Sequence, residues 1–209
     1  MVYKNIMPRI ILASASPQRK LLFDALNLPF KIIPADIDEA AIRDPDPKKQ
    51  ALLIARAKCD AVARREQGII IAADTFCVYK NKILEKPRDQ KEAAEMLRIL
   101  SGNTAFAYTG FCYLDPHTLG GVGVDREHGI NETALAETEF TFRELDADEI
   151  ARFVDIFPVT TWSAAFSPAY PYGMTLIASI RGSFTGFTHG LPMEILVPLL
   201  RRSGIAVIP

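Results

Sequence analysis

The sequence predicts an α/β or α+β fold in which helices flank a sheet. Short apolar segments of strand length alternate along the chain with longer amphipathic segments of helix length. Ser, Asp, Pro and Gly residues that cap helices or form turns stand between these segments. The 209 residues, of which 49% are hydrophobic, can bury a core without disulfides, so we expect one domain over residues 1–209.

The first half of the chain contains three expected strands and two expected helices. Ser16 followed by Pro17 is a favourable helix start, and we expect Leu21 and Leu22 on the apolar face of that helix. The expected strands cover residues 9–14, 30–33 and 69–73, and the expected helices cover residues 16–27 and 48–66. The strand over 69–73 is apolar throughout, as in a strand buried on both faces.

The second half repeats this alternation. Asp89 is placed to cap a helix that ends near Gly102, and Asp146 with Glu149 forms a capping pair for a helix through about Phe157. The remaining strands are expected over residues 106–114, 137–142 and 174–180, with a last helix from residue 192. A loop rich in glycine, including Gly120, Gly121 and Gly123, is expected between the first two of these strands.

The charge balance argues against a polymeric nucleic acid or a membrane as partner. Lys and Arg together number 24 and Asp and Glu 25, giving a net charge of -1 and no bulk field that would attract polyanions. No apolar window is long enough to span a bilayer, and residues 1–9 lack the apolar core of a signal peptide. The 3 cysteines are scattered among apolar residues, which favours a reducing compartment, and we expect a cytoplasmic protein.

Asp74 is the first candidate for chemistry. It follows the apolar strand over 69–73, and the carboxyl ends of strands in open α/β sheets commonly carry ligand-binding groups. A carboxylate there needs a metal, a donor or a cation to offset its desolvation. An Asx turn in a loop explains the residue equally well from its position alone.

Three cations are candidates for binding an anion. Arg19 lies in the first turn of the helix that follows Ser14, where free backbone amides also attract anions. Lys58 lies on the apolar stripe of the 48–66 helix, where a cation either reaches solvent or points into a cleft. Lys86, read alone, is typical of a surface lysine, and capping by Ser16 with a solvated Arg19 is the simpler reading of the first turn.

The acidic run Asp36, Asp38 and Glu39 follows the second strand and could bind Mg²⁺ through carboxylate oxygens, although most acidic loops are merely solvated. The 3 histidines form no metal-binding set and receive no role. Neither a GxxxxGK[ST] nor a GxSxG motif is present, which excludes a P-loop and a hydrolase nucleophile elbow.

The order of these residues resembles the Maf family of nucleoside triphosphate pyrophosphatases, the septum formation inhibitor Maf-like proteins. The resemblance covers essentially the whole chain. The blocks that carry it are Leu12-Ala-Ser-Ala-Ser-Pro-Gln-Arg19, Ile37-Asp-Glu39, Ala55-Arg-Ala-Lys58, Ala72-Ala-Asp-Thr75, Ile83-Leu-Glu-Lys-Pro87, Leu100-Ser-Gly-Asn103, Tyr108-Thr-Gly110 and Gly190-Leu-Pro192.

The resemblance implies an inosine-triphosphatase-like fold, with a twisted mixed sheet and a deep cleft between two lobes. It also implies a homodimer that uses Mg²⁺ or Mn²⁺ to hydrolyse nucleoside triphosphates to monophosphates and pyrophosphate. Asp74 would then accept a proton from the attacking water, with its pKa lowered by the metal. Phosphates would contact the side chains of Ser14, Arg19, Lys58 and Lys86, and Glu39 would bind the metal with Asp74.

Two departures from the family pattern leave the substrate open. Gln18 stands where the family usually has a first arginine, and Tyr170, within residues 166–171, falls about where the family has a polar side chain. We expect both side chains to contact substrate. The clearance of non-standard or modified nucleotides is one expected role. The alternative is a catalytically weakened, nucleotide-binding regulator of cell division.

Overall fold

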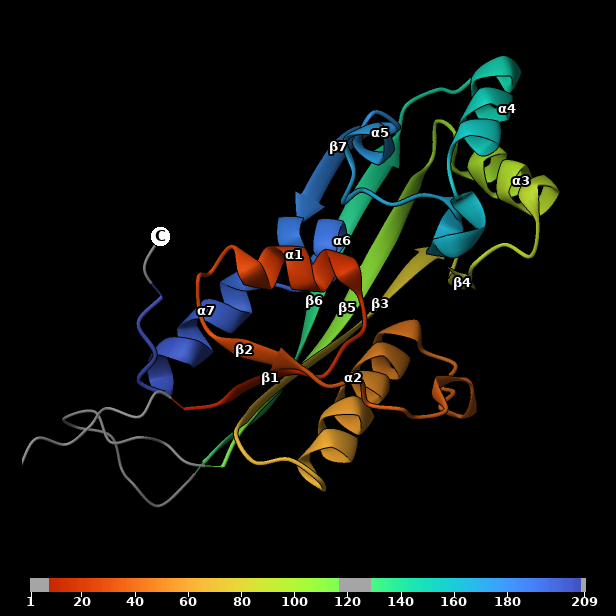
Figure 1. Cartoon of the computed structure of the whole chain (residues 1–209). Coiled ribbons are helices and arrows are strands. Elements are labelled where there is room, and N and C mark those ends of the chain that lie inside the picture. Colours follow the sequence, from red (N-terminus) through yellow and green to blue (C-terminus); the bar gives the residue numbers. More distant parts are fainter. Residues whose placement is uncertain (1–7, 117–128, 208–209) are drawn as a thin grey trace, which may run out of the picture.

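The computed structural model describes residues 8–116 and 129–207 (Figure 1). Within these residues one seven-stranded mixed sheet has the order β2-β1-β3-β5-β6-β7, and β4 pairs with β3. β1 pairs in parallel with β2 and β3, whereas the other pairs are antiparallel. The strands are β1 Ile10–Leu12, β2 Phe30–Ile32, β3 Ile69–Tyr79, β4 Lys82–Leu84, β5 Thr104–Asp115, β6 Ile130–Phe142 and β7 Ile177–Gly182.

Helices cover both faces of this sheet. In Figure 1, α2 packs on one face, α1, α6 and α7 lie across the other, and α3 and α4 gather at the far end of the long strands. The helices are α1 Pro17–Asp24, α2 Pro47–Ala63, α3 Gln90–Leu100, α4 Ala147–Ile156, α5 Pro171–Met174, α6 Phe184–His189 and α7 Met193–Arg202, with 3-10 turns η1 Glu39–Ala41, η2 Val159–Thr161 and η3 Ser163–Ala165. The predicted mixed α/β architecture is confirmed. None of the described helices is long and apolar enough to cross a bilayer.

The predicted helix starts follow the capping residues. The Asp89 carboxylate accepts a hydrogen bond from the Glu92 amide at 2.8 Å, and the Asp146 carboxylate accepts one from the Glu149 amide at 2.7 Å. The capping pair predicted for α4 is only half formed, because the Glu149 carboxylate instead accepts hydrogen bonds from the Arg143 guanidinium. These local contacts fix where α3 and α4 begin.

Several boundaries differ from the predictions. α1 ends at Asp24, three residues early, and turns Leu21 outward, with 59% of its surface exposed, while Phe23 takes the core position. α2 ends at Ala63 rather than residue 66. The last strand starts at Ile177 because Pro171 begins a short helical turn. β5 and β6 extend toward the glycine-rich loop, whose glycines 120, 121 and 123 lie outside the described residues.

The long strands β3, β5 and β6 connect two groups of core side chains. The lobe around β1 and the first half of β3 has one cluster on each face of the sheet: Ile11 and Ile70 pack against α2, and the other face packs against α1 and α7. The largest buried members of this second cluster are Ile10, Leu12, Phe23, Ile69, Ile71, Phe111 and Tyr113. The core of the other lobe packs under α3 and α4 and includes Leu97, Leu100, Phe140, Phe142, Ile150, Phe153, Phe166 and Phe187. Two lobes therefore share one sheet.

A gap in strand pairing opens the sheet between these lobes. The register of β1 on β3 ends at the pair Leu12 and Ile71, whereas β4 begins to pair with β3 only at Cys77. Between these points one edge of β3 has no described strand beside it, although β5 pairs along the other edge. The chain can therefore form a cleft at the middle of β3.

We predict that Gly110→Ala destabilises the protein by about 1–3 kcal/mol, because it overpacks the contact between β5 and α2. A Cβ atom at residue 110 would lie 2.1 Å from the backbone oxygen of Ala51 on α2. The free energy of unfolding in urea tests this. The control is Lys91→Ala on the exposed surface of α3, which we expect to change stability by less than about 0.5 kcal/mol. Equal stability of Gly110→Ala and the wild type would contradict this packing account.

Candidate functional site

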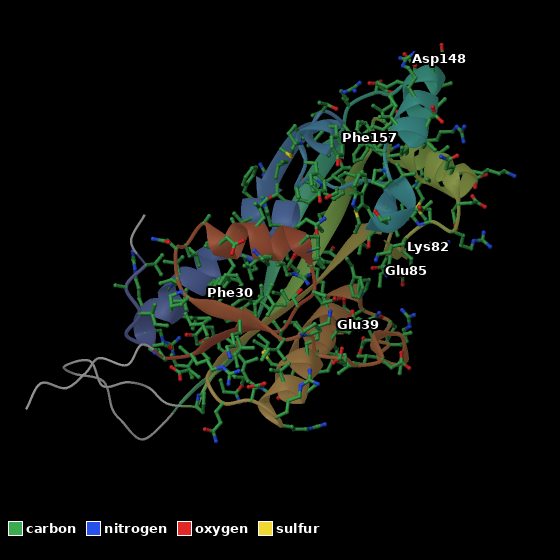
Figure 2. All side chains as sticks on the ribbon, in the orientation of Figure 1. Phe30, Glu39, Lys82, Glu85, Asp148 and Phe157 are labelled. Atoms are coloured by element: carbon green, nitrogen blue, oxygen red, sulfur yellow. The ribbon has the colours of Figure 1, made fainter. Side chains whose placement is uncertain are left out.

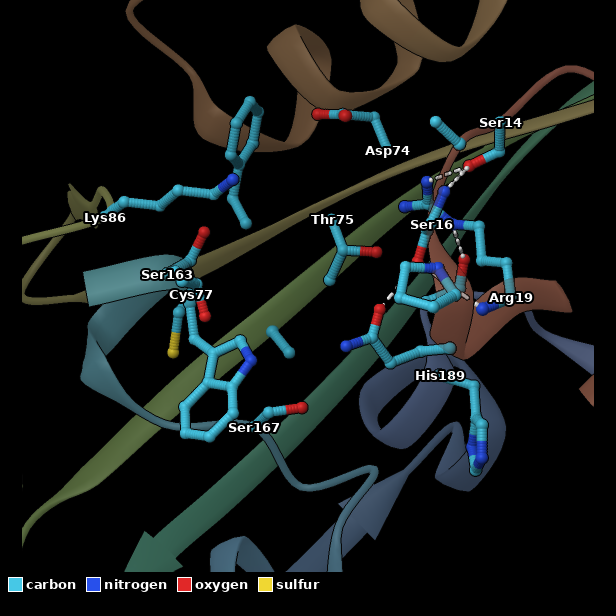
Figure 3. Close-up of a pocket in the computed structure, with 18 of the residues that line it drawn as sticks. Ser14, Ser16, Arg19, Asp74, Thr75, Cys77, Lys86, Ser163, Ser167 and His189 are labelled. Atoms are coloured by element: carbon cyan, nitrogen blue, oxygen red, sulfur yellow. Dashed lines mark hydrogen bonds between the residues drawn. The ribbon is translucent and has the colours of Figure 1, made fainter. Parts of the chain in front are cut away.

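A cleft of about 1230 Å³ lies between the two lobes, and all eight site residues chosen from the sequence line it. They come from the segment after β1, α1, η1, α2, β3, the segment after β4 and the segment before α5. In Figure 3 the side chains of Lys86, Asp74 and Arg19 are arranged around Thr75. The residues are Ser14, Gln18, Arg19, Glu39, Lys58, Asp74, Lys86 and Tyr170.

Asp74 lies in the middle of β3 and not at its carboxyl end, which corrects the sequence prediction. The strand continues because β5 pairs with it past this point, with Asp74 opposite Gly110. The side chain still reaches the cleft, since the edge of β3 is open there. Alternation along the strand puts Asp74 on the same face as Ala72, toward α2.

Lys58 on α2 joins two carboxylates. Its Nζ lies 2.8 Å from Asp74 Oδ1 and 2.9 Å from Glu39 Oε2. Lys58 and Asp74 are each only 7% exposed, whereas Glu39 is exposed. The cation on the apolar face of the helix thus points into the cleft and fixes the orientation of the Asp74 carboxylate.

The other Asp74 oxygen, Oδ2, is buried and has no hydrogen-bond partner among the described residues. Burial raises the pKa of the Asp74 carboxyl above its ordinary value, and the charges of Lys58 and Arg19 offset this only in part. The lowered pKa expected from the sequence assumed a neighbouring metal, and the protein side chains alone do not produce it. A buried, unpartnered carboxylate oxygen is available to a water molecule or a cation.

Arg19 is held in place by groups from two parts of the chain. Its Nε donates to the Gly190 carbonyl at 2.8 Å, and its Nη1 donates to Ser14 Oγ at 2.9 Å. Nη2 has no hydrogen-bond partner among the described residues. Burial lowers the pKa of the Arg19 guanidinium, while Asp74 and Glu39 oppose that shift. The side chain is fixed, with donors left for an anion.

Gln18 and Tyr170, the two departures from the family pattern, contact each other. Gln18 Nε2 donates to Tyr170 Oη at 3.4 Å, across 152 residues of sequence. Gln18 Oε1 accepts from Ser16 Oγ at 2.9 Å, and Ser16 Oγ accepts from the Arg19 amide at 3.4 Å as the cap of α1. The two residues that depart from the family pattern therefore connect the first turn of α1 to the opposite wall of the cleft.

Lys86 is exposed on the lining of the cleft and makes no hydrogen bond or ion pair with any described residue. Figure 3 shows its side chain extending along the cleft from the end of β4 toward Asp74. A lysine without a partner in the free protein can bind an anionic ligand at little cost in free energy, because no existing ion pair has to break.

The acidic run does not act as one cluster. Asp36 forms an ion pair with Arg65, and Asp38 caps η1, so only Glu39 joins Asp74. No group of three His, Cys, Asp or Glu side chains suited to a metal exists within the described ranges. Asp74 Oδ2 and Glu39 nevertheless fit Mg²⁺, which is bound by one or two carboxylates together with waters and substrate phosphates.

The sequence did not reveal several residues of the cleft. Gly190 contributes through its carbonyl, and its left-handed φ of 65° and its closeness to Thr75 and Arg19 leave no room for a side chain. Trp162 and Tyr172 also line the cleft, from the segment of short helical turns between α4 and β7. The density of aromatic residues over 157–172 was the available signal. Of the histidines, only His189 lines the cleft, and residues 117 and 128 lie outside the described ranges.

We predict that raising the pH destabilises the metal-free wild type relative to Asp74→Asn. A pKa raised by folding means that the folded state favours the protonated carboxyl. This contribution is complete below the unfolded pKa of about 3.9 and is lost as pH rises through the folded pKa. Urea unfolding of both proteins in a chelator, from acid to neutral pH, measures the difference. A wild type that gains stability relative to Asp74→Asn with rising pH would contradict the prediction.

Known proteins with similar sequences identify the family of this chain. The family model described as Maf-like protein matches residues 9–203. A dTTP/UTP pyrophosphatase of Anaeromyxobacter dehalogenans is 34% identical over 197 residues, covering 94% of this chain and 95% of that protein. A dTTP/UTP pyrophosphatase of Moorella thermoacetica is 34% identical over 202 residues, covering 96% and 98%.

Among solved structures, a HAM1 protein from Coxiella burnetii is 17% identical and covers 93% of this chain and 99% of its own, with a TM-score of 0.46. A likeness at this level carries no inference about function. The match to the family model spans nearly the whole chain, and the relatives are similar over nearly their full length. The chain therefore belongs to the Maf family.

Proposed function

We propose that this nucleoside triphosphate pyrophosphatase hydrolyses pyrimidine nucleoside triphosphates such as dTTP and UTP to the monophosphate and pyrophosphate. The observation that carries the proposal is the meeting of Asp74, with its free buried oxygen, and three cations in one cleft. The names of the relatives supply the substrate class. We further propose a cytoplasmic homodimer that uses Mg²⁺ or Mn²⁺ and that clears non-standard or modified nucleotides.

In the proposed reaction, Asp74 is the general base. Lys58 binds Oδ1, and in this proposal the buried Oδ2, which has no hydrogen-bond partner among the described residues, accepts the proton of the attacking water molecule. The water oxygen forms a bond to the α-phosphorus, and the bond from that phosphorus to the bridging oxygen breaks. The β- and γ-phosphates leave together as pyrophosphate.

The cations compensate the charge that develops on the phosphates. Arg19, fixed by Ser14 and Gly190, presents Nη2 to phosphate oxygens, and Lys86 can move to the leaving group because it has no other partner. A divalent metal would be held by Asp74 and Glu39 and would supply further positive charge to offset that of the phosphates. Groups fixed before the reaction stabilise the transition state without a further cost of reorganisation.

We predict that Asp74→Asn lowers kcat by at least about 100-fold, the usual contribution of a general base. Pyrophosphate release from dTTP, UTP, the other standard triphosphates and modified triphosphates, with Mg²⁺ or Mn²⁺, measures this. The matched control is Asp148→Asn, which alters an exposed carboxylate on α4 outside the cleft. Turnover no higher in the wild type than in Asp74→Asn would refute the enzymatic proposal.

The same assay separates the alternative, a nucleotide-binding regulator that has lost turnover. Gln18 and Tyr170 favour that alternative, because Gln18 stands where the family usually has an arginine and Tyr170 about where it has a polar side chain. Tight binding of a triphosphate without any product would support it, and product formation that depends on Asp74 would exclude it.

We predict that Lys86→Gln reduces kcat/KM by about 100-fold through loss of charge at the leaving group, while stability changes by less than about 0.5 kcal/mol. We expect stability to stay nearly unchanged because Lys86 makes no contact in the free protein whose loss would destabilise the fold. Steady-state kinetics and thermal unfolding of the same preparation measure both effects. Lys82→Gln, an exposed lysine on β4 outside the cleft, is the control. Unchanged kinetics of Lys86→Gln would remove this residue from the mechanism.

A further inference from the structure

An ion pair joins the two lobes at the end of the cleft where Lys86 lies. Arg43 Nη1 lies 3.4 Å from Glu85 Oε1. Glu85 directly precedes Lys86, and Arg43 follows η1, the turn that begins at Glu39. Figure 2 shows Glu39 and Glu85 in different lobes, on opposite sides of the cleft that both residues line. The ion pair between Arg43 and Glu85 therefore crosses the rim of the cleft beside Lys86.

Backbone hydrogen bonds fix the chain on both sides of this ion pair. The Glu85 carbonyl accepts a hydrogen bond from the Ala164 amide at 3.1 Å, which attaches the segment after β4 to η3. On the other side, Asp44 follows Arg43, and its amide donates to Gln50 Oε1 on α2 at 3.2 Å. Gln50 is buried, so the loop that carries Arg43 is attached to the core of its lobe. The two charged side chains are therefore presented from fixed positions.

The side chains themselves are free to exchange partners. The Arg43 side chain is 58% exposed and that of Glu85 61% exposed, and neither forms another ion pair or side-chain hydrogen bond within the described residues. An ion pair this exposed contributes little to stability, because solvent screens it. Phosphate oxygens are a stronger partner for a guanidinium, since they accept two parallel hydrogen bonds from it. Arg43 therefore loses little when it leaves Glu85 for a phosphate.

The leaving group of the proposed reaction comes close to this ion pair. Lys86, the residue after Glu85, is the cation proposed to move to the β- and γ-phosphates. The Glu85 carboxylate on the lining of the cleft repels those phosphates, whereas the Arg43 guanidinium beside it attracts them. In the free protein Arg43 does not line the cleft, because Glu85 holds it at the rim.

We propose that Arg43 is a fourth cation for the phosphates, which leaves Glu85 and binds the terminal phosphate when a triphosphate enters the cleft. This inference rests on the proposed function, because it takes Lys86 to mark the leaving-group end. The exchange needs a rotation of the Arg43 side chain and no movement of the fixed backbone on either side. Glu85 acts against binding, since it competes with the phosphate for Arg43. The pair thus sets the affinity for the leaving pyrophosphate.

The two products of the reaction separate this role from a structural one. Inorganic pyrophosphate and thymidine monophosphate are measured as inhibitors of dTTP hydrolysis by the wild type and by Arg43→Gln. We expect Arg43→Gln to weaken inhibition by pyrophosphate about 10-fold, the effect of losing one hydrogen bond between charged groups. Inhibition by the monophosphate should not change, because it lacks the phosphates that Arg43 contacts. A general distortion of the site would weaken both.

Glu85→Gln should change the inhibition in the opposite direction. Without its competitor, Arg43 should bind pyrophosphate about 2- to 5-fold more tightly, the range expected for the loss of one exposed ion pair. Most of this gain should disappear when Arg43→Gln is combined with Glu85→Gln. The matched control is the exposed ion pair of Arg202 and Glu132, which lie 2.7 Å apart on α7 and β6, outside the cleft. Arg202→Gln and Glu132→Gln should leave both inhibition constants unchanged.

The outcomes distinguish this inference from the proposed function. Unchanged inhibition by pyrophosphate in an active Arg43→Gln enzyme, or equal weakening of inhibition by both products, would overturn the role of Arg43 and leave the proposed function intact. Absence of pyrophosphate release by the wild type from every triphosphate would overturn the proposed function itself. Thermal unfolding shows whether each variant is folded, and the direction of the Glu85→Gln effect decides the inference even where Arg43→Gln does not fold.

Discussion

The buried ammonium of Lys58 is the interaction on which the site depends. It lies within 2.9 Å of carboxylate oxygens of both Asp74 and Glu39, and little of it reaches solvent. Such a charge is tolerated in the interior only when acids are fixed beside it, and those acids in turn need the cation. α2 must therefore pack closely on the middle of the sheet, which the absence of a side chain at Gly110 permits.

The cleft brings three cations, Arg19, Lys58 and Lys86, close to carboxylates in a chain whose net charge is -1. Lys58 is neutralised by its two acids in the free protein, whereas Arg19 is bound mainly by neutral oxygens and Lys86 by none that the structure describes. A polyphosphate can thus bind Arg19 and Lys86 without breaking an ion pair. Because Lys58 is paired with Asp74 in the free protein, the Asp74 carboxylate is already oriented before a ligand binds.

Much of the fold was readable from the sequence because local signals determine it. Capping by Asp89 and Asp146 set the starts of helices, and the apolar run before Asp74 identified the central strand. What the sequence could not show depends on tertiary contacts. The extension of β3 past Asp74 requires its pairing with β5, and Leu21 is exposed because α1 packs on the core through the face that carries Arg19 and Phe23.

The candidate site was predictable to a similar degree. The family resemblance selected eight residues, and the chain brings all of them to one cleft. The contribution of Gly190 escaped prediction because a backbone carbonyl leaves no trace in residue type. The packing of Trp162 and Tyr172 against Tyr170 also escaped prediction, because these rings come from a segment without helix or strand periodicity.

The central claim is that separate segments of the chain converge on one polyphosphate. A crystal structure with an α,β-methylene nucleoside triphosphate and Mg²⁺ tests it most directly. The account predicts phosphate oxygens in contact with Arg19, Lys58 and Lys86, and a water molecule between Asp74 Oδ2 and the α-phosphorus. Phosphates bound elsewhere, with Asp74 remote from the α-phosphorus, would contradict it.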